Sequence, residues 1–136
     1  MTLLERAHSA QKALFSRYDR LNQLWTEAEK RLTSNHVPHF VTVVCQRWPD
    51  IQGEETIEEI GLVKIKGEWR IGFTEVDGRD TDYLHVSWIP IVDCSAQIRV
   101  NCAKHLPKLE QAVVESAEKF IPRVDIAIDE LTKFLA

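Results

Sequence analysis

Several kinds of chemistry lack the residues they need in this chain of 136 residues. Its five glycines stand alone, at positions 53, 61, 67, 72 and 78, so there is no glycine-rich loop to cradle a phosphate. No serine stands in the G-x-S-x-G motif of a hydrolase nucleophile, and no cysteine lies in a catalytic signature. These absences favour a protein that is not an enzyme, and we expect no cofactor.

Metal-binding patterns are also missing. Only His36 and His39 of the five histidines are close in sequence, whereas a zinc site requires three or four ligands. The acidic cluster that begins at Asp77 has Asp82 and Trp88 where an EF-hand loop has its sixth-position glycine and twelfth-position glutamate. We expect no metal site.

The charge and the hydrophobic content restrict the partners and the compartment. The net charge is -4, and no cluster of lysine and arginine offers a surface for nucleic acid. No apolar run approaches the ~18 residues of a membrane span, and the first residues do not resemble a signal peptide. The three cysteines (Cys45, Cys94 and Cys102) are odd in number and fit a reducing compartment, where they would be small buried hydrophobes. These features predict a cytoplasmic protein that binds neither nucleic acid nor membranes.

What the chain does contain is two long apolar stripes at helical spacing. In residues 113–135 one stripe repeats every seven residues and stays in phase across Pro122, which predicts one helix that is kinked there; its members are Val114, Ala117, Ile121, Val124, Ile128, Leu131 and Leu135. The second stripe follows a capping box at Thr2 and Glu5 and runs to Ser34. A coiled coil is the alternative for this N-terminal helix, but its mixture of small and bulky members favours packing inside one domain. We expect both stripes to form part of the core.

Short runs of β-forming residues lie between the two helices. Residues 40–45 predict a first strand, residues 48–55 a surface loop, and residues 57–66 and 69–76 a hairpin that turns at Gly67. Pleat parity places Ile60, Leu62 and Lys64 on the same face as Trp69, Ile71 and Phe73, and we expect this face to meet the helices. Residues 83–89 predict a fourth strand that Pro90 stops.

Residues 94–106 fit either a strand or a helix, because their apolar positions match both periods. We favour a helix capped by Asp93 or Ser95, with Pro107 either kinking or restarting it. The complete prediction is a single α+β domain over residues 1–136. It consists of a four-stranded, mainly antiparallel meander with a long N-terminal helix and a kinked C-terminal helix packed on one face.

Weak candidates for a binding site are four residues of the types enriched at interfaces: Arg47, Trp48, Arg70 and Tyr83. Gly61 and Gly72 share the sheet face opposite the helices, where they leave room for an aromatic side chain such as that of Trp48.

The leading functional hypothesis is a non-enzymatic protein-binding or regulatory module. The alternative is a small-ligand-binding protein or an enzyme with a pocket between the sheet and the helices. Because a simple meander would leave the apolar first and fourth strands at its edges, we also expect a homodimer that covers one of them.

Overall fold

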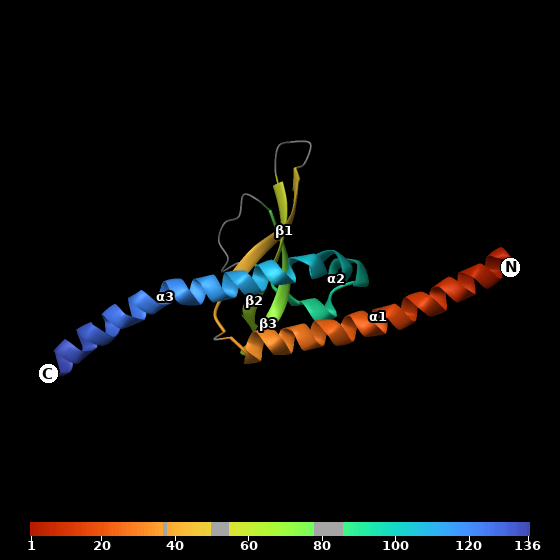
Figure 1. Cartoon of the computed structure of the whole chain (residues 1–136). Helices are drawn as coiled ribbons and strands as arrows, with labels where there is room; N and C mark the ends of the chain where they lie inside the picture. The colour runs from red at the N-terminus through yellow and green to blue at the C-terminus, as the bar shows by residue number, and fades with distance from the viewer. Residues whose placement is uncertain (37, 50–54, 78–85) are drawn as a thin grey trace.

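The computed structural model describes residues 1–36, 38–49, 55–77 and 86–136. Two long helices, α1 (Leu3–Ser34) and α3 (Leu106–Leu135), enclose in sequence the strands β1 (Val41–Pro49), β2 (Glu55–Ile65), β3 (Glu68–Asp77) and β4 (Ile89–Pro90) (Figure 1). Between β4 and α3 lie two short 3-10 turns, η2 (Ile91–Asp93) and η3 (Ala103–His105), and the helix α2 (Ala96–Cys102). The predicted α+β class is confirmed.

The strands form the predicted antiparallel meander, in the order β1-β2-β3-β4. The hairpin turns at Lys66 and Gly67, which both have positive φ, as a two-residue turn that matches the twist of the strands requires. Leu62 pairs with Ile71, and the predicted pleat parity is confirmed along the whole hairpin.

Two predicted strands have other first or last residues in the structure. Trp48 and Pro49, predicted to lie in a loop, are the last residues of β1, because the pairing with β2 continues past a bulge at Cys45. The fourth strand is only Ile89–Pro90, and Pro90 does not stop it but pairs with Gly72 of β3. This position is compatible with proline because β4 is an edge strand. Residues 83–85 of the predicted strand lie outside the described residues.

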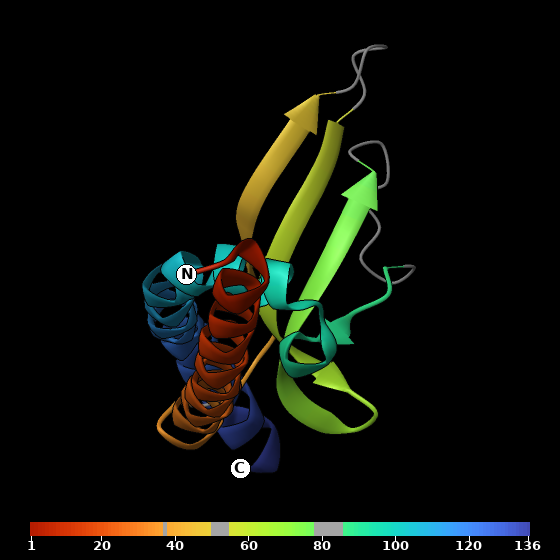
Figure 2. The same ribbon diagram turned by 90° about the vertical axis from the view of Figure 1, so that its right-hand side faces the viewer.

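The helices cover one face of the sheet (Figure 2). Side chains from this face, such as Ile60 and Ile71, pack with Trp25 of α1, Cys102 of α2 and Leu109 of α3 in a single core. The capping box at Thr2 begins α1 as predicted.

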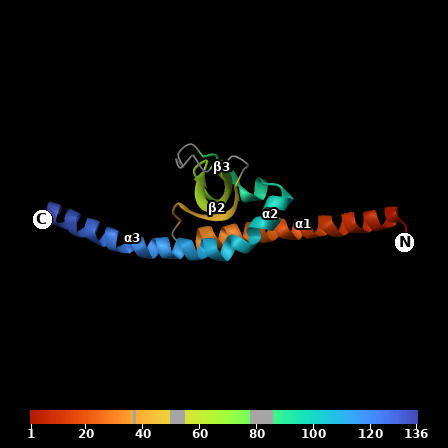
Figure 3. The same ribbon diagram turned by 90° about the horizontal axis from the view of Figure 1, so that it is seen from above.

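Residues 96–106 are helical, so the helix favoured from the sequence is confirmed, with Ser95 as its N-cap. The Ser95 hydroxyl accepts from the backbone N–H of Ile98 and caps α2, and Pro107 lies in the first turn of α3, where its missing N–H costs no hydrogen bond. Pro122 lies inside α3, which continues through it and curves toward its C-terminal end (Figure 3).

The opposite face of the sheet holds the paired glycines Gly61 and Gly72. A Cβ atom on Gly72 would lie 3.2 Å from a ring carbon of Trp88, so this ring occupies the space left by the glycine. The aromatic side chain that fills this space is therefore that of Trp88, not the predicted Trp48, which is exposed in β1. Trp88 also packs edge-on against Phe40, with 6.1 Å between the ring centroids.

The two long helices extend well beyond the sheet, in opposite directions. Figures 1 and 3 show α1 and α3 side by side only where α1 ends and α3 begins, beneath the sheet, with the two termini at opposite ends of the molecule. A helix of about 30 residues spans roughly 45 Å, whereas a four-stranded sheet is only about 15–20 Å wide across its strands. The sheet therefore cannot cover helices that cross it.

Candidate protein-binding surface

The C-terminal part of α3, residues 117–135, is an arm that projects into solvent; we call it the α3 arm. One face of it carries seven large apolar side chains that are all exposed: Phe120, Ile121, Val124, Ile128, Leu131, Phe134 and Leu135. The prediction that the C-terminal stripe is part of the core is therefore wrong over most of its length. Burial in α3 ends near Val113, because the sheet ends there.

The apolar face of the α3 arm continues the face of α3 that packs on the sheet. Leu109 and Val113, both fully buried, lead at helical spacing to Ala117, Val124 and Leu131. The arm therefore presents its apolar stripe toward the side of the helices on which the sheet lies. We call the sheet, together with the parts of the helices that pack on it, the body of the protein. The stripe of the α3 arm remains uncovered beside the body, where a second chain can reach it.

A groove of about 540 Å³ lies at the base of the α3 arm. Its walls come from α3 and from the segment that leads into β1; the lining residues are Pro38, His39, Ser116, Ala117, Phe120, Ile121, Val124 and Asp125. The walls are mostly apolar, so the groove suits an apolar side chain better than a charged ligand.

The N-terminal part of α1, residues 3–18, forms a second arm, the α1 arm. Its exposed apolar side chains are fewer, and small residues such as Ala7 and Ala10 interrupt them; the large ones are Leu3, Leu4, Leu14 and Phe15. Residues 1–20 contain four basic side chains (Arg6, Lys12, Arg17 and Arg20) against two acidic ones (Glu5 and Asp19). The α1 arm is therefore the more basic and the less apolar of the two.

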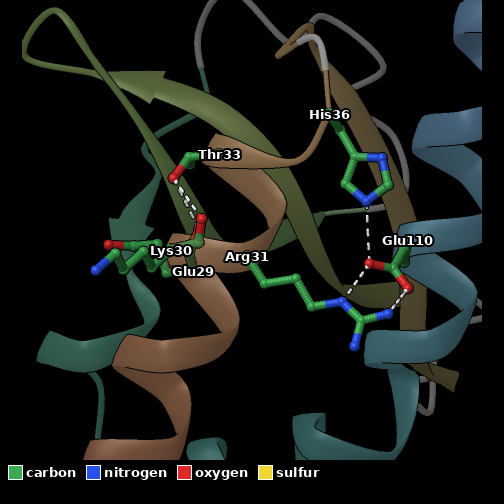
Figure 4. A network of polar contacts seen from close by, with 6 residues as sticks. All are labelled: Glu29, Lys30, Arg31, Thr33, His36 and Glu110. Atoms are coloured by element: carbon green, nitrogen blue, oxygen red, sulfur yellow. Dashed lines mark hydrogen bonds and ion pairs between the residues drawn. The ribbon is translucent and has the colours of Figure 1, made fainter.

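A polar network fixes the start of α3 against the end of α1 (Figure 4). The Glu110 carboxylate accepts from Arg31 Nε at 2.8 Å and Nη2 at 2.6 Å, and its Oε2 lies 3.0 Å from His36 Nε2. The hydrogen bonds from Arg31 make the largest contribution to lowering the pKa of Glu110, and the bond from His36 makes the next largest. The bidentate pair links the end of α1 to the start of α3 at the surface, next to the core that holds both helices.

Of the four binding candidates chosen from sequence, Arg47 and Trp48 lie together on β1, and Arg70 lies apart from them on β3. Arg47 and Trp48 lie near the end of β1, where Arg47 Nη1 is 3.2 Å from Glu55 Oε2. Arg70 lies toward the hairpin end of β3 and donates from Nε to Glu29 of α1 at 2.9 Å, which makes it part of the attachment of α1 to the sheet. Tyr83 lies outside the described residues.

The cysteines are free thiols on three elements of the body. Cys102 is buried, whereas Cys45 and Cys94 are only half-buried, less than predicted. A hydrogen bond with the Cys102 thiol lowers the pKa of Cys45 and raises that of Cys102, and burial raises the pKa of Cys94. A thiol whose pKa is raised is a poor nucleophile at neutral pH, so the geometry does not prepare Cys94 or Cys102 for catalysis.

A second hollow, of about 650 Å³, lies between β3 and the segment that leads into α2. Glu75, Asp77 and Asp93 are among its lining residues, together with Cys94. Among the side chains that the structure describes, no three histidine, cysteine or acidic groups gather closely enough to hold a metal ion.

The exposed faces could have been anticipated from helix length. Two helices of 32 and 30 residues need far more covering surface than one face of a small sheet provides, and the in-phase stripe of α3 already marked which face would remain open.

No family model, curated protein or solved structure matches this chain, so comparison with known proteins adds no function. None of the helices in the described ranges is both long and apolar enough to cross a membrane.

Proposed function

We propose that this protein is a non-enzymatic protein-binding module that works as a homodimer in the cytoplasm, and that the apolar face of the α3 arm is its binding surface. The observation that carries the proposal is the row of seven exposed large apolar side chains on one face of a single helix. Contiguous exposed apolar surface of this kind is typical of interaction sites. The net charge of -4 argues against nucleic acid as the partner.

The reason for expecting a homodimer has changed with the structure. The sheet edges offer little to a second chain, because β4 is only two residues long and β1 is interrupted by the bulge at Cys45. The α3 arm offers much more. Its seven apolar side chains expose on the order of 800 Å², which is the area that each partner contributes to a standard stable interface.

Sedimentation velocity over a range of micromolar concentrations tests the proposal, with two matched variants of the α3 arm. Ile128 lies on the apolar face and is 54% exposed, whereas Ile126 lies on the opposite face and is 59% exposed. The wild-type protein is expected to reach twice its mass of 15.7 kDa. Ile128→Glu is expected to weaken the dimer about 100-fold or more, because its carboxylate would be buried without a partner.

Ile126→Glu is the control, since it adds the same charge to the same helix and leaves the apolar face intact. It is expected to dimerise like the wild-type protein. A wild-type protein that stays monomeric at high micromolar concentration would refute the homodimer. Equal effects of the two substitutions would show that the apolar face is not the interface.

A further inference from the structure

We infer that two copies join through their α3 arms, packed antiparallel about a two-fold axis, with Phe134 and Leu135 of each copy seated in the groove at the base of the other copy's arm. This inference rests on the proposed function and specifies its partner and geometry.

The body restricts the ways in which two copies can approach. Because the stripe of the α3 arm faces the side on which the sheet lies, a second copy whose body stood opposite the first would collide with it before the stripes met (Figure 3). Antiparallel α3 arms avoid this collision, since they place the two bodies at opposite ends of the pair. The contact is also isologous and closes at two copies, whereas pairing an α1 arm with an α3 arm in head-to-tail fashion adds further copies into a ring or an open chain.

The spacing of the stripe suits this antiparallel arrangement. The positions 117, 121, 124, 128, 131 and 135 are symmetric about residue 126. A two-fold axis at this point places Ile121 opposite Leu131 of the second copy and Val124 opposite Ile128. The four central large apolar side chains then meet one another, as packing of apolar helix faces requires, and Leu135 lies opposite the smaller Ala117.

Charges beside the stripe select the α3 arm over the α1 arm. In antiparallel α3 arms, Arg123 of one copy lies beside Glu130 of the other, because both side chains flank the same edge of the stripe and stand at nearly equal distances from residue 126. The two-fold axis produces this opposite-charge pair twice, whereas the one like-charge contact, between the two Asp125 side chains on the other edge of the stripe, occurs once. Two antiparallel α1 arms would instead bring Arg6, Arg17 and Arg20 of both copies together, since these side chains flank one edge of the α1 stripe.

The groove at the base of the arm matches the tip of the arm. Phe134 and Leu135 are 83% and 79% exposed, the largest values on the apolar face of the α3 arm. The same two-fold axis brings them opposite residues 117 and 118 of the second copy, beside the groove that Ala117, Phe120 and Ile121 help to line. The apolar tip of each arm therefore lies beside the apolar groove at the base of the other arm, and the two surfaces complement one another.

Charge exchange tests the antiparallel pairing. Arg123→Glu alone places like charges together twice and is expected to weaken the dimer about 10-fold, and Glu130→Arg alone is expected to do the same. When the two single variants are mixed, both contacts in the mixed dimer again join opposite charges, so dimerisation is expected to recover. A mixture no stronger than its separate components, measured by sedimentation at one total concentration, would overturn the inference.

Photo-crosslinking locates the tip. Benzoylphenylalanine in place of Phe134 is expected to crosslink to residues 116–121 or to Pro38 and His39 of the second copy, and the same group in place of Ile126 is expected to give no crosslinked dimer. A crosslink from position 134 to position 134 of the second copy would indicate parallel arms, and one to the α1 arm would indicate head-to-tail assembly. Either result overturns the inference while the proposed homodimer stands; a monomeric wild-type protein, or equal effects of Ile128→Glu and Ile126→Glu, refutes both.

Discussion

Two leucines on the same helix allow the boundary between core and arm to be measured. Leu109 is fully buried in the core at the start of α3, whereas Leu131 is 61% exposed on the α3 arm. Leu109→Ala removes the same atoms as Leu131→Ala, in a helix of the same propensity. The pair therefore compares burial alone.

The expected magnitudes differ widely. Leu109→Ala should lower the free energy of unfolding by about 3 kcal/mol, because the loss of transfer free energy and the cavity add together at a site that packed neighbours enclose. This corresponds to a fall of roughly 10 °C in the melting temperature for a domain of this size. Leu131→Ala should change the stability of the monomer by less than about 0.5 kcal/mol, as expected for an exposed site.

The assay is denaturant unfolding at a protein concentration well below the dissociation constant of the dimer, so that association does not contribute. Repeating the titration at high concentration should reveal a cost for Leu131→Ala that is absent from the dilute sample. If Leu131→Ala cost as much as Leu109→Ala in dilute solution, the α3 arm would be packed on the body and the concept of a projecting arm would be wrong.

Three further predictions concern the body. Gly61→Ala should destabilise the fold by about 2 kcal/mol in denaturant unfolding, because its Cβ would lie 2.7 Å from the backbone oxygen of Val41, and a neutral result would contradict this close approach. Glu110→Gln should cost about 0.5–1 kcal/mol at neutral pH. Because folding lowers the pKa of Glu110, this stabilisation is complete above the unfolded value of 4.5 and is lost as the pH falls through the folded pKa, so unfolding curves of the variant and the wild type should converge in acid; a constant difference would refute this origin. Cys45 should react with a thiol reagent before Cys94 and Cys102, as peptide mapping would show, and faster labelling of Cys94 would contradict the lowered pKa of Cys45.

Most of the fold could be predicted because local signals determine it. The capping box at Thr2 begins α1, and the turn at Lys66 and Gly67 sets the register of the hairpin. The short β4 could not be predicted, since residues 86–88 have the composition of a strand but do not pair as one. Trp88 instead lies over Gly72 on the outer face of the sheet. Tertiary packing overrides strand propensity there.

The candidate site was only half predictable. The stripe of α3 was evident, but the same periodicity marks a face that is buried in the chain's own core and a face that remains open to another chain. What separates these outcomes is the extent of the sheet beside α3, which packs on β1 and β2, and this extent is a tertiary property that the periodicity of one helix does not contain. Candidates such as Arg47 and Arg70 were chosen by residue type, and the structure shows that each forms an ion pair within the body instead.

Because α3 has a buried start and an exposed arm, selection for folding acts on the residues of its start, and selection for binding acts on the residues of its arm. A substitution near Leu109 changes whether the chain folds, whereas a substitution near Leu131 changes only which surface it meets. Pro122 lies between these segments and lacks the N–H that would bond to the carbonyl of Glu118, so the arm can change its direction at this point without disturbing the core. Substitutions in the last two turns of the helix can therefore change the specificity for a partner while the fold remains the same.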